Sequence, residues 1–203
     1  MLNIVKEGDL VAEPAGDMTG RKRQIFEAAV ALILAKGLAA TSTRAVTERA
    51  GVGTGLLSHY FRWSDLRAAA WKVIFEALVE AEFGAALPPE DSLERYFSWA
   101  FAPQARRYWQ LWLEATDIAK EDAAMAAKLG EVQREMGRRM AAVLRAGTTA
   151  GKWRIADPEA TALRLGALND GLAGLLIAGA AGLDPKAAEE HLRRAFALEC
   201  GAA

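Results

Sequence analysis

The sequence contains very little cysteine and no long apolar run, and each shortage excludes a class of protein. Cys200 is the only cysteine among the 203 residues, so it cannot form an intrachain disulfide, and we expect a chain that works in the reducing cytoplasm. No run of roughly 18 or more apolar residues is present, so we expect neither a transmembrane helix nor a membrane partner.

Residue patterns that carry catalysis or hold cofactors are also missing. Cys200 follows His191 by nine residues, a spacing that does not bring two side chains together on one helix face. The acidic pair Glu121 and Asp122 lacks the spacing of metal ligands and fits the start of a helix. No glycine-rich phosphate loop follows a predicted strand. We therefore expect no enzyme activity, no metal and no cofactor.

Charged residues are distributed unevenly, although the whole chain carries a net charge of only −1. Residues 18–72 hold nine lysines and arginines against three acidic residues, a net charge of +6, which leaves −7 for the rest. Such a basic segment indicates either a surface that meets an anion such as DNA or a merely solvated face. Residues 1–17 contain four acidic residues and do not resemble a signal peptide, so we expect a flexible arm there.

Apolar residues recur with the period of a helix, and no segment alternates like a strand, so the sequence predicts an all-α fold of about nine helices. Asp157-Pro158 and Asp184-Pro185 each predict a helix start, because aspartate caps free amides and proline tolerates the first helical position. Pro103 predicts another start, and Gly182 predicts the end of the eighth helix. The expected helices are 20–36, 43–50, 54–60, 64–83, 90–100, 103–118, 121–150, 157–181 and 184–199.

Residues 42–61 have the organisation of a helix-turn-helix motif. Ser42 is a suitable N-cap for a first short helix, Gly51 ends that helix, and a second short helix follows over 54–60. Two short helices joined by a tight glycine-containing turn are typical of DNA-binding motifs whose second helix enters the major groove.

Polar and small side chains of this motif fit contacts with a DNA duplex. Thr54 and Ser58 can hydrogen-bond bases or phosphates, and Gly55 lets the backbone come close to the duplex. His59 and Tyr60 can reach phosphates, although either residue can instead belong to the core or the free surface. The expected DNA-binding residues are Ser42, Thr43, Arg44, Thr54, Gly55, Leu56, Ser58, His59, Tyr60 and Arg62.

The segment from Val52 to Phe61 resembles the recognition helix of the TetR family, in its BetI-like branch. The resemblance is specific over about residues 21–70 and only architectural over residues 71–203. It implies a homodimeric repressor that binds a palindromic double-stranded DNA operator and is released by a small molecule. It also implies a helix-turn-helix DNA-binding domain over residues 18–70 and an effector-binding and dimerisation domain over residues 71–203.

Two residues depart from the family pattern. Gly53 stands where members usually have a capping Ser or Thr, and Ser64 stands where they usually have a phosphate-binding Lys. Arg62 can substitute for that Lys; otherwise phosphate affinity should be weaker. These departures leave open a helical adaptor that kept the fold without operator binding, and a helical enzyme is the other alternative.

Aromatic residues cluster between positions 96 and 112, and two explanations fit them. They either pack as an ordinary core or line an effector site suited to an aromatic or cationic molecule. The acidic and amide side chains that interrupt the eighth helix need a ligand, a water or a helix neighbour if they are buried, and they can also bridge helices at a dimer interface. The BetI-like resemblance favours a quaternary ammonium or similar cation. The expected effector-binding residues are Trp109, Trp112, Asn169 and Asp170.

The eighth predicted helix is rich in glycine, which destabilises a helix by about 0.5–1 kcal/mol per residue relative to alanine. Close approach of another helix compensates for this. That helix belongs either to the same subunit or to a second copy in a two-fold four-helix interface. The expected dimer interface consists of Leu168, Gly171, Leu172, Gly174, Leu175, Leu192 and Phe196.

Overall fold

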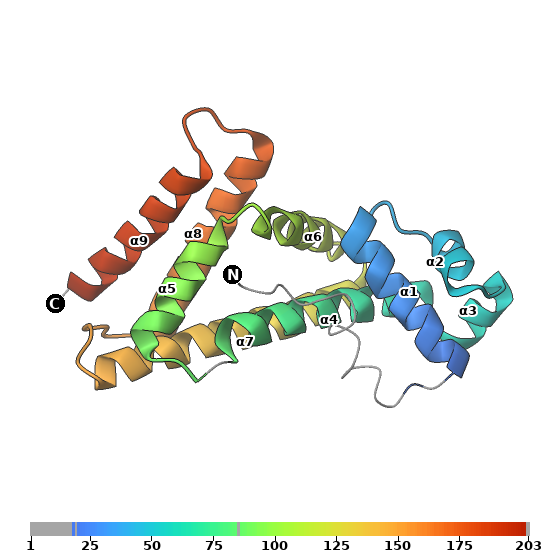
Figure 1. The fold of residues 1–203 in the computed structure, drawn as a ribbon, viewed down its shortest axis with the longest axis horizontal. Helices are drawn as coiled ribbons and strands as arrows, with labels where there is room; N and C mark the ends of the chain where they lie inside the picture. Colours follow the sequence, from blue (N-terminus) through green and yellow to red (C-terminus); the bar gives the residue numbers. More distant parts are fainter. Residues whose placement is uncertain (1–17, 19, 85, 202–203) are drawn as a thin grey trace. The chain divides into compact units, whose positions relative to one another are not determined.

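The computed structural model describes residues 18, 20–84 and 86–201, and these residues form nine α-helices and no strand, which confirms the predicted fold class (Figure 1). The arm expected at residues 1–17 lies outside them. None of the helices in this described part has the length and apolarity that a membrane-spanning segment needs. The helices are α1 (Gly20–Lys36), α2 (Thr43–Ala50), α3 (Thr54–Tyr60), α4 (Trp63–Phe83), α5 (Pro89–Ala100), α6 (Ala105–Ile118), α7 (Ala123–Thr149), α8 (Pro158–Ala178) and α9 (Pro185–Gly201).

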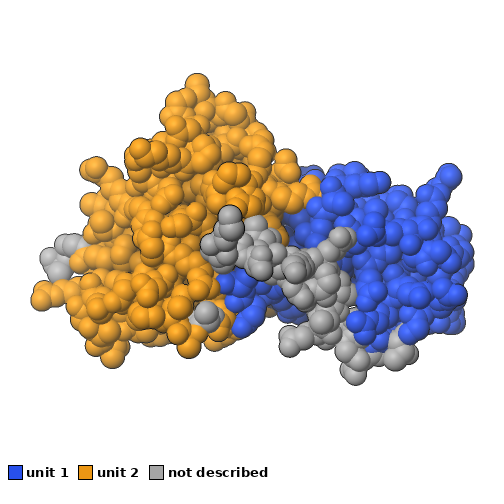
Figure 2. Space-filling model, viewed as in Figure 1, with its two compact units in different colours: residues 1–81, 111–132 blue, residues 82–110, 133–203 orange. Residues whose placement is uncertain are grey.

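The chain divides into two compact units, coloured blue and orange in Figure 2. Unit 1 comprises residues 1–81 and 111–132, and unit 2 comprises residues 82–110 and 133–203. Helices α4, α6 and α7 therefore each have residues in both units. A division of the sequence at residue 70 remains a proposal, since the compact units are not two consecutive stretches of chain.

Unit 1 is built on the apolar face of α1. Ile25, Ala29 and Ile33 recur at helical spacing on this face and are completely buried. Val46 of α2 and Leu57 of α3 are at most 2% exposed, and both helices contact α1. The three-helix arrangement predicted from the helix-turn-helix motif is therefore present, with its short helices held by burial rather than by their own length.

The end of α1 is held by a carboxylate from α6. Glu114 accepts hydrogen bonds from the backbone amides of Leu38 at 2.5 Å and Ala39 at 3.3 Å. A Cβ atom at Gly37 would lie 2.8 Å from the nearer Glu114 oxygen, so a larger residue there would push the carboxylate away. Glu114 thus replaces the hydrogen bonds that these two amides, which follow the last turn of α1, would otherwise make with water.

Unit 2 has its own apolar core, formed by one face each of α5, α7, α8 and α9. Its buried members come from all four helices and from the segments that follow α5 and α7. They are Leu93, Tyr96, Phe97, Ala100, Phe101, Met140, Ala141, Leu144, Ile155, Ala162, Leu165, Leu172, Ala173, Ala188 and Leu192.

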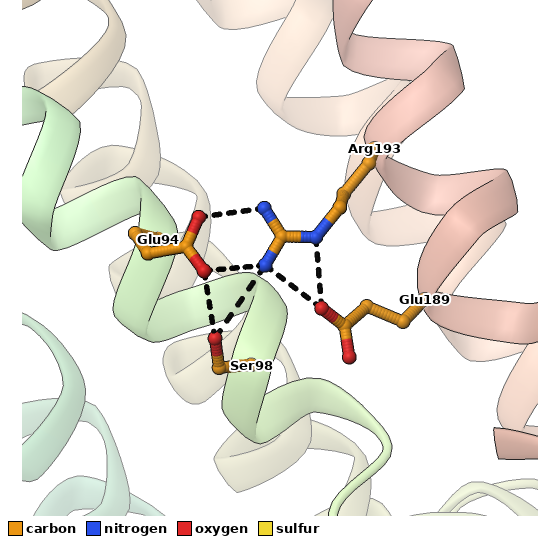
Figure 3. Close-up of polar contacts among 4 residues, drawn as sticks. All are labelled: Glu94, Ser98, Glu189 and Arg193. Atoms are coloured by element: carbon orange, nitrogen blue, oxygen red, sulfur yellow. Dashed lines mark hydrogen bonds and ion pairs between the residues drawn. The ribbon is translucent and has the colours of Figure 1, made fainter. Parts of the chain in front are cut away.

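A polar cluster on the surface of unit 2 joins α5 to α9 (Figure 3). Arg193 donates two parallel hydrogen bonds of 2.6 Å to Glu94, and its Nε donates to Glu189 at 2.8 Å. Ser98 donates to Glu94 at 3.0 Å, and the Arg193 guanidinium lies 5.0 Å from the centre of the Phe97 ring. The paired, two-pronged geometry fixes α9 against α5 more firmly than a single surface ion pair would.

A glycine in α7 makes room for an indole in unit 2. A Cβ atom at Gly147 would lie only 1.8 Å from the Trp153 ring, so no other residue fits without displacing that ring. Trp153 donates from Nε1 to the carbonyl of Leu144 at 2.8 Å and stacks edge-on against Phe196 at 5.3 Å. The Trp153 ring therefore packs against the unit 2 core and is held in place by these contacts.

The predicted Asp-Pro helix starts are confirmed. The Asp157 carboxylate accepts from the amide of Ala160 at 2.9 Å, and Asp184 accepts from Ala187 at 2.8 Å. In both helices the following proline occupies a first-turn position that has no helical hydrogen bond to lose.

Two predicted helix ends are wrong. Helix α8 ends at Ala178, because Gly179 already adopts the left-handed conformation (φ 71°, ψ 36°) that terminates a helix, three residues before Gly182. Helix α6 begins at Ala105 rather than at Pro103, since residues 101–104 form a turn.

Candidate functional site

The first helix of the helix-turn-helix motif has both its ends capped. The Ser42 hydroxyl accepts from the amide of Ala45 at 3.2 Å, as the N-cap prediction requires. Gly51 ends α2 in the left-handed conformation (φ 63°, ψ 36°), and its amide donates to the carbonyl of Glu48. A Cβ atom at Gly51 would meet nothing within 4 Å, so the requirement for glycine is one of backbone conformation and not of space.

The second helix, α3, presents its polar residues to solvent. Leu57 is buried at 2%, whereas Thr54, Ser58 and His59 are exposed and Tyr60 is 38% exposed. The structure therefore leaves the predicted contact face of α3 open. Of the alternatives considered for Tyr60, this position favours the surface over the core.

The N-terminus of α3 lacks a side-chain cap. Gly53 occupies the N-cap position, with no side chain to accept a hydrogen bond from the first free amides. The departure from the family pattern therefore has a small structural consequence: a Ser or Thr cap would stabilise α3 by about a few tenths of a kcal/mol relative to Gly53.

Several side chains of the predicted DNA-binding set are exposed but already engaged within the chain. Arg44 is 85% exposed and pairs with Glu48 at 2.8 Å, one helical turn away. Ser58 donates to the carbonyl of Thr54 at 3.3 Å, and the rings of His59 and Tyr60 meet edge to face at 5.1 Å. The Arg44 pair is fully solvated, so exchanging Glu48 for a phosphate would cost little. Of the remaining members, Ser42, Gly55 and Arg62 are exposed, and Thr43 and Leu56 are half-buried.

Two of the basic residues counted in the N-terminal segment are tied to α7 or to the turn before it. Arg67 pairs with Asp122 at 2.6 Å, with only 21% and 13% of the two side chains exposed, and Lys72 pairs with Glu131 at 2.9 Å. Lys22, by contrast, lies 5.6 Å from the Phe61 ring beside the end of α3. The basic residues of this segment therefore fall into two groups. Arg67 and Lys72 form ion pairs within the protein, whereas Lys22 lies beside the helix-turn-helix motif.

A polar surface hollow of about 830 Å³ lies beside the start of α4. Arg62, Ser64 and Lys120 line it, together with acidic residues that include Asp65 and Asp117. Lys120 pairs with Asp117 at 2.7 Å. Arg62 thus stands next to Ser64, where the family pattern has a Lys, but the charge of the hollow is mixed.

Trp112, predicted as an effector contact, lies in a buried aromatic cluster of unit 1. Its ring centre is 5.7 Å from that of Trp71 and 5.4 Å from that of Phe75, and the side chain is 7% exposed. Trp71 donates from Nε1 to the carbonyl of Leu111 at 3.1 Å. Core packing therefore accounts for Trp112 in this structure.

The other three predicted effector residues belong to unit 2. Trp109 is half-buried, packs on the unit 2 core and donates from Nε1 to the carbonyl of Ala100 at 2.9 Å. Asn169 is 4% exposed, and its buried side-chain oxygen has no hydrogen-bond partner among the described residues. Asp170 is half-buried. The unsatisfied Asn169 oxygen is unfavourable by about 1–3 kcal/mol unless another molecule bonds to it.

Glu82, near the end of α4, was not among the predicted functional residues. It is 7% exposed, its Oε2 has no hydrogen-bond partner, and burial raises the pKa of its carboxyl to about 8. The sequence did contain a signal, because Glu82 follows Leu78 by four residues and Val79 by three, on the buried face of the helix.

The predicted dimer-interface residues fall into two groups. Leu172 and Leu192 are buried in the core of their own unit 2, while Leu168 and Phe196 pack partly against it. Leu175 is 50% exposed, and a Cβ atom at Gly171 or Gly174 would meet nothing within 4 Å. Packing within one subunit therefore explains the two leucines and not the two glycines.

Further small and apolar residues are exposed along α8 and α9. Leu163 and Leu198 are 73% and 65% exposed, and Ala167 lies one turn before Gly171 on the exposed side of α8. Leu163, Ala167, Gly171, Gly174, Leu175 and Ala178 form what we call the α8 stripe.

Comparisons with known families agree with this geometry. The C-terminal part of BetI-type transcriptional repressors matches residues 89–201, more than half of the chain, and the tetR family of bacterial regulatory proteins matches residues 25–63. No curated protein sequence gives a significant match.

Solved structures show the same fold over most of the chain. A protein from Pseudomonas aeruginosa PAO1 assigned as a transcriptional regulator is 25% identical, with a TM-score of 0.71 over 90% of this chain and 91% of that one. The multidrug binding protein EbrR complexed with proflavin is 25% identical, with a TM-score of 0.65 over 87% and 99%. A regulator from Saccharomonospora viridis in complex with choline is 21% identical, with a TM-score of 0.70 over 85% and 93%.

The exposed helix-turn-helix in an all-helical chain defines the protein as a DNA-binding transcriptional regulator. The chain belongs to the TetR family, with a C-terminal part of the BetI repressor type. Its activity is therefore ligand-responsive repression of transcription.

Proposed function

We propose that two copies of the chain bind a palindromic DNA operator with α3 of each copy in the major groove, and that an organic cation held in unit 2 releases them. The observation that carries this proposal is the open polar face of α3 above the buried Leu57. The two half-sites would lie one helical repeat of DNA apart, roughly 34–36 Å. Such a repressor acts in the cytoplasm, where the DNA is.

For the DNA contacts, we assign the bases to Thr54 and Ser58 and the phosphates to residues around them. Arg44 can leave its solvated Glu48 partner for a phosphate or a guanine edge, and His59 and Arg62 are exposed at the end of α3. The remaining members of the contact set are Ser42, Thr43, Gly55, Leu56 and Tyr60.

The DNA contacts are tested on an operator selected from random duplexes, with affinity read by fluorescence anisotropy. Ser58→Ala and Arg44→Ala should each weaken binding about five- to tenfold without lowering the melting temperature, since both side chains are exposed. Arg138→Ala, an exposed arginine of α7, is the matched control and should bind normally. Unchanged affinity of both motif variants would remove these residues from the interface.

The dimer is assigned to the α8 stripe and the exposed side of α9. Leu163, Leu175 and Leu198 are large exposed apolar residues, and the open surface at Gly171 and Gly174 permits close approach of a second α8. Leu172 and Leu192 support these helices from within the subunit instead.

The oligomeric state follows from sedimentation or light scattering. Leu175→Asp should convert the dimer to a monomer, because it puts an unpaired charge into the interface. Ala142→Asp, at an exposed alanine of α7, is the control and should remain dimeric. A monomeric wild type would exclude the two-copy arrangement, and a dimeric Leu175→Asp would move the interface elsewhere.

Two side chains of unit 2 and one similar structure support a cationic or aromatic molecule as the effector. Trp109 offers an aromatic ring, and the buried Asn169 oxygen accepts no hydrogen bond from the part of the chain that the structure describes, so both suit a cationic or aromatic molecule. The structure of EbrR contains proflavin, a cationic aromatic dye. Proflavin is therefore the first probe, and release of the selected operator by proflavin is the expected result.

Two observations favour a second candidate function, an adaptor that does not bind an operator. Helix α3 has no side-chain cap at Gly53, and Ser64 replaces a family Lys. If no duplex is enriched by selection at low salt, the adaptor becomes the better assignment.

A further inference from the structure

Unit 2 contains a carboxyl, that of Glu82, with an oxygen to which none of the described residues donates a hydrogen bond. Glu82 lies at the C-terminal end of α4, is 7% exposed, and has an Oε2 atom without a hydrogen-bond partner. Burial alone raises the pKa of this carboxyl to about 8, so that it is protonated at neutral pH in the ligand-free protein. A buried polar group without a partner destabilises the folded state, and such groups are concentrated at binding sites.

Tyr96 of α5 lies beside the end of α4 that carries Glu82. The Tyr96 ring stacks on that of Phe83, the residue after Glu82, with centres 6.4 Å apart. Burial raises the pKa of Tyr96 far above its usual value, and the carboxylates of Glu82 and Asp170 contribute to this rise. Asn169 lies four residues after Leu165 and three before Leu172, on the face of α8 that packs in the same core as Tyr96.

We propose that Glu82, Tyr96 and Asn169 form the polar end of a binding site for an organic monocation in unit 2, and that Glu82 releases its proton to solvent when the cation binds. The inference rests on the proposed function, since the cation is the effector. It adds the residue that carries the counter-charge and a proton stoichiometry.

The chemistry of the three side chains selects a cation. A carboxylate, an amide oxygen and the face of a phenol ring all present negative charge or electron density to a ligand. When Glu82 loses its proton, its O–H bond breaks, both electrons stay on the carboxylate, and the proton leaves for the buffer. One positive charge enters as another departs, so the net charge of the buried site does not change and the large cost of burying an unpaired ion is avoided.

Other titratable groups around Glu82 do not replace it in this role. Tyr96 of α5 stays neutral over the accessible pH range because its pKa is raised, and Asp170 of α8 is half-buried with an interaction of its own. On α4 itself, Glu80 is exposed. The proton exchanged near neutral pH therefore comes from Glu82.

Linkage gives the expected size of the effect. Below the pKa of Glu82 each pH unit should change the affinity for a cation about tenfold, with tighter binding at higher pH, and above about pH 8 the affinity should level off. Wild-type protein should thus bind a cation about fiftyfold more tightly at pH 8, where half of Glu82 is ionised, than at pH 6.

The proton is counted by isothermal titration calorimetry of wild-type protein with proflavin and with choline, at one pH in buffers of different ionisation enthalpy. Choline carries a permanent charge and so adds no protons of its own. Near pH 7 we expect about one proton released per cation bound. Binding without proton release overturns the proposal, and this measurement requires no variant.

Two variants locate the group. Glu82→Gln should bind both cations with no proton release and no pH dependence, and at pH 8 at least tenfold more weakly than wild type. Glu190→Gln, at an exposed glutamate of α9 in the same unit, should behave as wild type. A Glu82→Gln protein that keeps the wild-type pH dependence contradicts the assignment.

Failure of this inference and failure of the proposed function remain distinguishable. If neither cation binds at any pH while the selected operator does, the cation site is wrong and the DNA-binding function stands. If a cation binds and releases DNA without a proton, only the role of Glu82 is wrong. An equal response to potassium chloride at the same concentration would indicate general ionic screening and would also overturn the site.

Discussion

The two units hold their candidate functional side chains in opposite environments. In unit 1 the polar residues of α3 are exposed above a core that includes Leu57, so they are accessible to a partner from outside the chain. In unit 2 Glu82 and Asn169 carry their unsatisfied atoms inside the protein. A surface that reads DNA keeps its hydrogen-bonding groups in water until the duplex arrives, whereas a site for a small molecule holds them desolvated in advance. The difference implies that substitutions at the functional residues should leave the stability of unit 1 nearly unchanged and should alter that of unit 2.

The largest effect on stability is expected at Gly147, where the Trp153 ring leaves no room for a larger residue. Gly147→Ala should lower the free energy of unfolding by about 3 kcal/mol, because the added methyl group overlaps the Trp153 ring. Gly137→Ala, in the same helix but with nothing within 4 Å of the new atom, should instead gain about 0.5–1 kcal/mol from helix propensity. Urea unfolding of both variants measures this, and equal stabilities would show that the unit 2 core is loosely packed.

The next effect concerns the buried carboxyl. The folded-state pKa of Glu82, about 8, lies above its unfolded value of 4.5, so its stabilising contribution is present below pH 4.5 and is lost as the pH rises towards 8. Glu82→Gln should therefore have the stability of wild type near pH 4.5 and be about 3 kcal/mol more stable at pH 7. Thermal melts across this range test the sign, and a variant that is less stable at pH 8 would show that the carboxylate has a partner.

A smaller loss is expected at the carboxylate that holds the end of α1. Glu114→Ala should destabilise unit 1 by about 1–2 kcal/mol, because the amides of Leu38 and Ala39 lose their acceptor. Hydrogen exchange should quicken at these two amides and remain slow in unit 2. Thr116→Ala, in the same helix, is a control that removes only a bond to the carbonyl of Trp112. Unchanged exchange at Leu38 would contradict the role of Glu114.

The smallest effect separates the two kinds of basic residue in unit 1. Arg62→Ala should reduce the slope of log affinity against log salt by about 0.9, the value for one phosphate contact. Lys72→Gln should leave the slope unchanged, since Lys72 pairs with Glu76 and Glu131. Equal reductions in both variants would mean that charge count, rather than position, sets the salt response.

Local signals in the sequence were sufficient for most of the fold. The Asp-Pro starts at residues 157 and 184 and the turn at Gly51 depend on a few neighbouring atoms, and the structure has them as predicted. The end of α8 was misplaced because Gly179 and Gly182 both adopt positive φ angles, and the sequence does not rank two competing glycines.

The residues that were predicted less well are those whose burial and contacts depend on the tertiary structure. Leu172 and Leu192 pack inward while Leu175 is exposed, a distinction that depends on where α5 and α7 lie. Trp112 joins Trp71, 41 residues earlier in the chain, through contacts that composition cannot reveal. Glu82 was detectable by its spacing from Leu78, but only burial shows that its carboxyl has no partner.

The central claim, that unit 1 binds DNA under the control of a cation in unit 2, is tested most directly by measuring operator affinity with and without proflavin at pH 8. The account predicts that saturating proflavin weakens operator binding at least tenfold, and that saturating operator weakens proflavin binding by the same factor, as linkage requires. Proflavin bound to unit 2 with no change in operator affinity would contradict it.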